Sequence, residues 1–481
     1  MKKIITIALT AAAILSSCSK DFLVEEPVLS QSDALTLSTF DGLDKSVAGA
    51  YAPLASTSWY CGDFILSNEM RTMNGKRWSN FTRYNSGRYI NDYSINFTPT
   101  STSSVWSLGY YVILAANSVI ENLDNVDADE QDKNNIKAEA LFLRALSHFD
   151  IVRTFAKPYA TGASSLGCPI VLTVDSEAKP ARNTVKEVYD QVITDLLEAE
   201  KIIDPTYSRS GVTDATACAN IYSIEALLSR VYLYSEQWQK AADYATKVIN
   251  SGKYTMWTAD QIATEEDGEV TSVFNDNVPS KGEVIFEIYE GLSQAYGGGN
   301  ENVCGMTSYN GYGDCGASQD LADLYDEGDV RGLLVSPDPD GDCLFTLKYQ
   351  GKGLSSIDVN NTIVLRLSEM YLNRAEAIIN GASVAGVTAL GDLETIAKNR
   401  GAAIQPATKN GVWTERAKEL AWEGHLWFDL ARTGRDMTRT DVSGTQVPTT
   451  LAAGDYRWAM PIPDREFTVN PNLVQNDGYS K

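Results

Sequence analysis

Apolar residues recur at three- and four-residue steps over much of the chain, the spacing that places them on one face of an α-helix. The segment 137–159 carries one such stripe, formed by Ala138, Leu141, Ala145, Phe149 and Val152. Pro158 is expected to end this helix. Further stripes predict helices over the segments 40–54, 105–123, 185–203, 363–380 and 416–432. The repeated pattern indicates a mainly α-helical protein.

The segment 221–250 shows the helical pattern twice, with a tight turn at 236–238 between the halves and Gly252 as the stop signal. Two antiparallel helices with small alanines at their crossing and an aromatic residue, Trp238, at the turn resemble a tetratricopeptide unit. Because the spacing between such units is irregular, we predict an irregular array of tetratricopeptide-like helix pairs.

Three stretches, 58–104, 255–361 and 436–481, interrupt the helical pattern with Asn, Gly and Pro and with short alternating runs such as 283–289. They also contain many aromatic residues, so we expect them to be ordered. They predict an irregular, loop-rich subdomain containing a few short strands. The helical scaffold is expected over approximately 40–57, 105–254 and 362–435.

The amino terminus reads as a bacterial export signal, with two early lysines, an apolar run at 4–15 and small residues before Cys18. A transmembrane helix needs about 20 residues, so this run is too short to be one. The site resembles a lipobox, which predicts a signal peptide at 1–17, lipidation of Cys18 and a lipid-anchored tether at 18–39. An ordinary secretory signal is the alternative. Residues 19–21 resemble the short acidic signal of lipoproteins exposed on the outer membrane of Bacteroidetes, so we expect an outer-membrane, cell-surface location.

The formal net charge of −23 repels phosphate backbones, so we expect no nucleic-acid partner. Of the seven cysteines, Cys18 is assigned to lipid, and the remaining even number permits disulfides outside the cytoplasm. Cys304 and Cys315 flank a glycine-rich segment and are the candidate pair, with free buried cysteines as the alternative. The chain has only two histidines and no Cys-x-x-Cys motif, which argues against zinc.

Four stretches carry motifs that occur together in one known family. They are RLSEMYLNRAEA at 366–377, ERAKELAWEGHLWFDL at 415–430, the closing segment 461–479, and Asp329-x-Arg331 ahead of Lys348-Tyr349. In this combination the chain resembles the SusD/RagB-like nutrient-binding lipoproteins of Bacteroidetes. Leu426, Thr433 and Asp477 depart from the family pattern, all within scaffold elements.

The resemblance implies a tetratricopeptide-like helical side and an irregular subdomain. It also implies a surface lipoprotein that binds a nutrient, most often a glycan or oligosaccharide. The nutrient would be delivered to a partner TonB-dependent outer-membrane transporter of the SusC-like type. The helical face would meet the transporter, and the loop-rich face would hold the nutrient.

Sugars present flat C–H faces that stack on aromatic rings, while neighbouring polar groups bond to their hydroxyls. The loop-rich stretches supply six aromatic candidates for ligand binding: Trp78, Tyr84, Tyr89, Tyr296, Tyr309 and Tyr312. Trp59, Tyr60 and Tyr93 belong to the same polar sequence, which favours exposure of its rings. The alternative is that such rings fill small cores beneath the loops.

The acidic residues Glu419, Glu423 and Asp429 share a predicted helix with His425, and we interpret them as scaffold carboxylates that bond neighbouring arginines. Asp338–Asp342 alternates as in a calcium loop but contains proline and lacks the distal glutamate. No nucleophile, metalloprotease or phosphate-loop motif occurs. We therefore expect no enzymatic activity, no cofactor and no metal. A glycan hydrolase using two carboxylates, and a non-catalytic helical scaffold or adhesin, remain the alternative functions.

Overall fold

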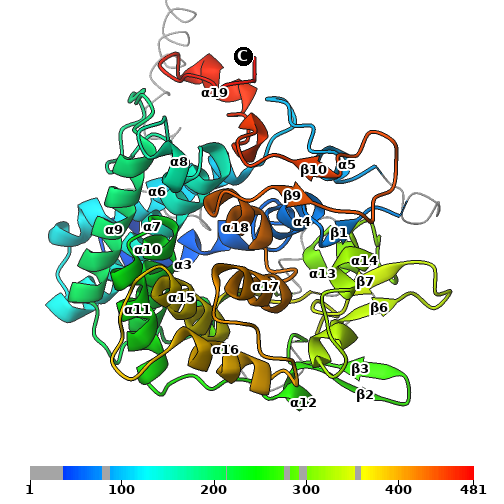
Figure 1. Ribbon diagram of the computed structural model, residues 1–481. Helices are drawn as coiled ribbons and strands as arrows, with labels where there is room; N and C mark the ends of the chain where they lie inside the picture. Colours follow the sequence, from blue (N-terminus) through cyan, green and yellow to red (C-terminus); the bar gives the residue numbers. More distant parts are fainter. Residues whose placement is uncertain are drawn as a thin grey trace, which may run out of the picture.

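The computed structural model describes residues 36–78, 87–212, 214–275, 282–291, 301–352 and 359–480. Cys18, Tyr84 and Tyr296 lie outside this part of the chain, as does the predicted signal peptide. Within it, long helices form one side of the molecule, and short strands with long loops form the other (Figure 1). The predicted fold class is therefore confirmed.

The scaffold consists of long helices that pack largely in sequence order. Their bounds are α3 Phe40–Ala50, α6 Val105–Asn122, α7 Glu130–Phe155, α9 Val185–Ile202, α10 Ile221–Tyr234, α11 Trp238–Asn250, α15 Leu367–Ile379, α16 Ala389–Lys398, α17 Lys409–Glu419 and α18 Leu426–Arg432. α7 packs between α6 and α9 and is buried along most of its length, and α11 packs against both α10 and α15. The tight turn predicted between the halves of 221–250 separates α10 from α11.

Local sequence signals set the ends of these helices. The Thr184 hydroxyl accepts a hydrogen bond from the backbone N–H of Glu187, whose carboxylate accepts one from the N–H of Thr184. This capping box starts α9 where the periodicity predicted it. Asp129 caps α7 by accepting from the N–H of Gln131, so this helix begins earlier than the predicted 137. Its first turns are mostly polar and therefore carry no apolar stripe.

Shorter elements build the loop-rich side and the connections. The short helices are α4 Asp63–Met70, α5 Ile90–Tyr93, α8 Tyr159–Gly162, α12 Ala259–Ile262, α13 Val303–Thr307, α14 Gln319–Ala322 and α19 Asp464–Val469. The 3₁₀ turns are η2 Ala52–Ala55, η4 Leu123–Asn125, η5 Ala215–Ala217, η6 Val330–Leu334 and η7 Tyr456–Trp458. The strands are β1 Gly75–Lys76, β2 Thr264–Glu266, β3 Glu269–Thr271, β4 Val284–Ile288, β5 Gly316–Ala317, β6 Val335–Pro337, β7 Leu344–Thr346, β8 Thr362–Arg366, β9 Met437–Thr438 and β10 Thr450–Leu451. All pair antiparallel; the largest sheet has the order β1-β5-β7-β6.

The helix predicted over 363–380 is wrong at its start. Residues Thr362–Arg366 form β8, which pairs antiparallel with β4, and α15 begins only at Leu367. Every residue of β8 is buried. A short apolar run that is buried on both faces shows no alternation, so periodicity cannot distinguish it from a buried helix segment.

The single helix predicted over 416–432 is also wrong. α17 ends at Glu419, and α18 begins at Leu426 after a turn in which Trp422 and Gly424 have φ values of 63° and 76°. The N–H of Gly424 donates to Glu69 Oε1 at 2.6 Å. A side chain at 424 would have its Cβ only 3.0 Å from Ile65 Cδ1, so close approach as well as the left-handed conformation requires glycine.

The expectation of exposed rings is wrong for Trp59, Tyr60 and Tyr93, which are almost fully buried. Trp59 Nε1 and the Tyr60 hydroxyl both donate to Asp150 Oδ2 on α7, at 3.0 and 2.7 Å. These bonds satisfy the polar atoms of the rings inside the core. The two hydrogen bonds attach the first loop-rich stretch to α7. They also allow aromatic rings within a polar sequence to be buried, because the polar atoms of the rings keep a partner.

Of the two alternatives for Cys304 and Cys315, the structure agrees with buried cysteines that are not joined by a disulfide. All six cysteines of the described residues are buried, and none of them forms a disulfide. Cys304 belongs to α13, and Cys315 directly precedes β5. Burial raises the pKa of the Cys315 thiol well above its usual value, and Asp314 adds to the shift. The Cys315 thiol therefore serves as a small apolar group beneath the loops.

Candidate functional site

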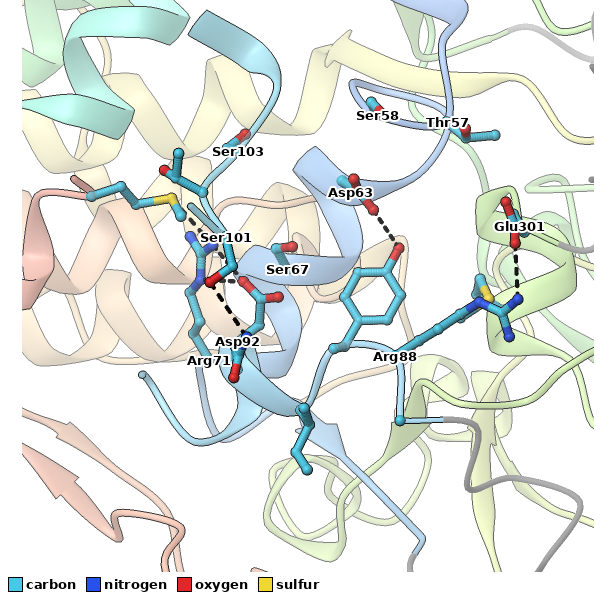
Figure 2. A pocket seen from close by; sticks show the side chains of 17 residues that line it. Thr57, Ser58, Asp63, Ser67, Arg71, Arg88, Asp92, Ser101, Ser103 and Glu301 are labelled. Atoms are coloured by element: carbon cyan, nitrogen blue, oxygen red, sulfur yellow. Dashed lines mark hydrogen bonds and ion pairs between the residues drawn. The ribbon is translucent and has the colours of Figure 1, made fainter. Parts of the chain in front are cut away.

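A polar cavity of about 420 Å³ opens on the loop-rich side. Its walls come from α4, from the segment 87–103 and from residues near α13 (Figure 2). Six serine and threonine side chains line it: Thr57, Ser58, Ser67, Ser101, Thr102 and Ser103. Hydroxyls both donate and accept hydrogen bonds, so these walls match the hydroxyls of a polyol. We call this the first cavity.

Asp63 and Tyr89 form the first of three charged or polar pairs in this cavity. The Tyr89 hydroxyl donates to Asp63 Oδ1 at 2.7 Å. Tyr89 has a left-handed backbone (φ 55°), which is uncommon for an aromatic residue. Burial raises the pKa of the Asp63 carboxyl to about 6, although the bond from Tyr89 lowers it in part. Asp63 therefore changes its protonation state in a mildly acidic range.

Arg71 and Asp92 form the second pair, on the opposite side of the cavity from Arg88 (Figure 2). Arg71 donates to Asp92 Oδ1 through Nε at 3.1 Å and Nη2 at 2.6 Å, and through Nη1 to Asn68 Oδ1 at 3.1 Å. Its guanidinium lies 4.6 Å from the centroid of the Phe97 ring. The arginine is held on several sides, so its position is fixed before a ligand arrives.

Arg88 and Glu301 form the third pair. Arg88 Nη2 donates to Glu301 Oε1 at 2.8 Å, and Nη1 lies 3.6 Å from Asp314 Oδ2. The guanidinium also lies 4.2 Å from the centroid of the Tyr312 ring. Arg88 thus joins the cavity wall to Tyr312, and each cation that lines the cavity has an anionic partner.

The aromatic candidates divide between two places. Tyr89 lines the first cavity, and Tyr312 stacks on Arg88 at its edge. Trp78 and Tyr309 instead pack on a separate small cluster with Cys343 and Phe345. Trp78 Nε1 donates to Leu344 O at 3.3 Å, while Lys76 Nζ lies 4.0 Å from the Trp78 ring centroid. Trp78 and Tyr309 are half-buried, so their role as ligand contacts stays a prediction.

Several residues of the first cavity were not predicted from the sequence. Asp63, Ser67 and Arg71 follow one another at four-residue steps, so they share the face of α4 that points to the cavity. A polar stripe at helical spacing was the signal that could have identified them. Glu301 and Met460 come from distant segments and gave no such signal.

The interpretation of the carboxylates as scaffold residues is confirmed. Glu419 accepts hydrogen bonds from Arg366, Arg331 and Arg400 at 2.6 to 2.8 Å. Burial alone would raise the pKa of Glu419, but the three arginines lower it well below its usual range. Arg366 also donates to Glu423, and two further buried arginines, Arg416 and Arg432, donate to Asp429.

The acidic segment Asp338–Asp342, which alternates as in a calcium loop, forms a turn stabilised by its first aspartate. Asp338 is buried, and its Oδ1 accepts hydrogen bonds from the backbone N–H groups of Asp342 and Cys343 at 2.9 and 3.1 Å. The aspartate therefore closes a turn between β6 and β7. No cluster of three or more metal-ligating side chains is found among the described residues.

The chain belongs to the SusD/RagB-like family. Residues 21–233 match the family described as "Starch-binding associating with outer membrane", and residues 344–479 match the SusD family. SusD-like protein P2 of Formosa agariphila is 27% identical over the full length of both chains. A SusD-like protein of Bacteroides ovatus is 23% identical over 89% of this chain and 82% of its own.

Solved structures agree in fold. A SusD superfamily protein of Bacteroides vulgatus is 28% identical, with a TM-score of 0.81 over 92% of this chain and all of its own. A laminarin-binding SusD-like protein, 21% identical, has a TM-score of 0.68 over 91% of this chain and 99% of its own. In the part of the chain that the structure describes, none of the helices is both long and apolar enough to span a bilayer.

Proposed function

We propose that the protein is a surface-exposed lipoprotein that binds a glycan in the first cavity and delivers it to a TonB-dependent outer-membrane transporter. The observation that carries the binding role is the first cavity itself. Its hydroxyls, its held arginines and the Tyr89 ring give the mixture of polar bonds and flat apolar contact that sugars require. The descriptions of the matched family and of the laminarin-binding neighbour support a glycan as ligand.

The charge pattern of the first cavity favours a neutral sugar. Arg71 and Arg88 are bonded to Asp92 and Glu301, so a ligand meets ion pairs and hydroxyls. An acidic sugar would have to compete with these carboxylates for the arginines. Binding would therefore depend on hydrogen bonds to hydroxyls and on stacking.

The binding test is calorimetric titration of the mature protein with laminari-, malto- and galacturono-oligosaccharides. We expect a neutral oligosaccharide to bind. Tyr89→Ala combined with Tyr312→Ala should weaken it at least about tenfold, because each stacked ring contributes about 0.5–1.5 kcal/mol beyond the effect of its buried area. Tyr111→Ala is the matched control, since Tyr111 lies on α6 and is 60% exposed. Full affinity in the double variant would remove the first cavity from the proposal.

A hydrolase is the second candidate, because Asp63 and Asp92 line one cavity and Asp63 has a raised pKa. We propose binding without turnover, since Asp92 is held by Arg71 and no catalytic motif accompanies the pair. Incubation of the bound oligosaccharide with the protein, followed by chromatography, should return it unchanged. Shortened products that disappear in an Asp63→Asn variant would assign hydrolysis instead.

The membrane role rests on Cys18 and on the family. Acyl chains on this cysteine would hold the protein at the outer membrane, and stable anchoring requires such chains to be buried in lipid. Cys18→Ala should therefore move the protein from the membrane fraction to the soluble fraction. The test uses cells that lack the partner transporter, so that binding to this transporter cannot hold the variant at the membrane. Continued sedimentation of the variant with outer membranes would argue against lipidation.

A further inference from the structure

A second cavity, of about 260 Å³, lies within the helical scaffold and shares no lining residue with the first cavity. It is bounded by the end of α10, the start of α11, the end of α15, α17 and the residues that follow α18. A neighbouring cavity of about 430 Å³ shares Trp413, Gly434 and Arg435 with it. The two hollows are therefore adjacent, and the neighbouring one is also lined by the carboxylate of Asp436.

The second cavity is lined by an excess of positive charge, although the whole chain has a net charge of −23. Its charged residues are the cations Lys409, Arg416, Arg432 and Arg435 and the carboxylates Glu236 and Glu376. Two of the cations are neutralised: Arg432 donates to both oxygens of Glu376, and Arg416 donates to Asp429.

The other two cations, Lys409 and Arg435, have no ion-pair partner among the described residues. Arg435 donates only to the neutral amide oxygen of Asn410, at 2.9 Å, and it is half-buried. Burial lowers the pKa of its guanidinium. Lys409 is exposed at the first turn of α17, where the helix dipole also places positive charge. This arrangement favours an anionic group, because an oxyanion would supply the missing partner for both.

The aromatic residues of the second cavity favour a sugar ring. Trp413 and Trp238 both line it and are half-buried. The Arg435 guanidinium lies 4.8 Å from the Trp413 ring centroid, and Trp413 Nε1 makes no hydrogen bond within the described residues. The buried hydroxyl of Tyr234, also on the wall, has no partner there either. Both atoms are buried away from the hollow, so a sugar would contact the rings of the two tryptophans and not these donors.

We propose that the second cavity is a separate binding site for an acidic sugar, whose carboxylate or sulfate is bound by Arg435 and Lys409 and whose ring packs on Trp413. This proposal rests on the proposed glycan-binding function in one respect, namely that the ligand is a sugar. It differs from the first cavity in charge, because there the cations are already paired. The protein would thus hold an acidic unit on the helical side and a neutral one on the loop-rich side.

The test compares D-galacturonic acid with D-galactose, which differ only in the carboxylate at C6, and adds D-galactose 6-sulfate as the sulfate arm. Binding is followed at low salt by the indole N–H signals in ¹H–¹⁵N NMR spectra, with the Trp413 signal assigned from Trp413→Phe. We expect an acidic sugar to shift the Trp413 signal and to bind at least about tenfold more tightly than galactose. The stronger of the two acidic sugars identifies the group. Equal binding of galactose would overturn the proposal.

Arg435→Gln should weaken the acidic sugar about tenfold or more. Lys253→Gln changes the net charge equally but lies beyond the far end of α11 from Trp238, and should leave binding unchanged. If Arg435→Gln lowers the melting temperature, the affinity of Lys409→Gln for the acidic sugar is measured instead, because the Lys409 side chain is exposed. Unchanged affinity of Lys409→Gln would overturn the proposed site. The Tyr89→Ala, Tyr312→Ala double variant should keep the Trp413 shift. Loss of the shift there would place the acidic sugar in the first cavity.

Discussion

Glu419 in the helical scaffold and Asp63 in the first cavity are two carboxylates in opposite surroundings. Glu419, the last residue of α17, is about 2% exposed and accepts hydrogen bonds from three buried arginines. Asp63, on α4, has no cation bonded to it in the described structure and accepts from a tyrosine. The arginines keep Glu419 ionised, whereas burial raises the pKa of Asp63 to about 6. The scaffold therefore depends on its buried charges, while the cavity holds a carboxylate that is costly to ionise.

The largest expected effect comes from Glu419→Gln. The change leaves Arg366, Arg331 and Arg400 without their shared carboxylate in a region where all three are buried. Removing one partner from a buried ion network costs about 3–5 kcal/mol. Urea unfolding followed by circular dichroism measures the free energy of unfolding. Asp190→Asn is the control, because it removes an exposed pair with Lys186, which is worth at most about 1 kcal/mol. Equal effects of the two variants would contradict the comparison.

Asp63→Asn should raise the free energy of unfolding, whereas Glu419→Gln should lower it. Because the pKa of Asp63 is raised in the folded protein from 3.8 to about 6, the folded state binds more protons than the unfolded state over that range. The free energy of unfolding of the wild type therefore falls as the pH rises from about 4 to about 6, through this group. The variant lacks this contribution and should be more stable than the wild type at pH 7, by about 1–3 kcal/mol.

The measurement for Asp63 is urea unfolding of both proteins between pH 4 and pH 7. Glu69 and Glu225 also have pKa values raised to about 7 by burial, so the absolute pH profile is not specific to Asp63. The difference between the two proteins isolates it, and this difference should grow as the pH rises to about 6 and then level off. A difference independent of pH would show that Asp63 does not titrate in this range.

The smallest effect on stability is expected from Trp78→Ala. This variant tests whether Trp78 belongs to the ligand site or to the small cluster beneath the loops. Trp78 is half-buried on the cluster with Phe345, so truncation should cost about 1 kcal/mol of stability. Its predicted role as a ligand contact is checked by titrating the same variant with the oligosaccharide that the wild type binds. A loss of affinity without loss of stability would make Trp78 a binding residue. A loss of stability alone would make it a residue of the small core.

The fold was more predictable from the sequence than the site. The stripes at 105–123 and 185–203 became α6 and α9 almost residue for residue, because each has one buried face, and α9 also has a local capping box. In the site, Tyr89 and Tyr312 were predicted from composition, and both lie at the first cavity. Trp78 came from the same polar sequence and packs elsewhere. Composition places rings in a loop, but it does not state which way each ring turns.

The sequence by itself determined the helix-pair scaffold and the loop-rich stretches, since each depends on neighbours along the chain. Only the tertiary structure decided that 362–366 is a strand, because β4 is its partner. It also decided that the chain turns at Gly424, where Ile65 and Glu69 approach from α4. The pairing of Glu419 with Arg331 and the meeting of Arg88 with Tyr312 join residues far apart in sequence. Burial and distant charges fix these features, and neither leaves a periodic signal in the chain.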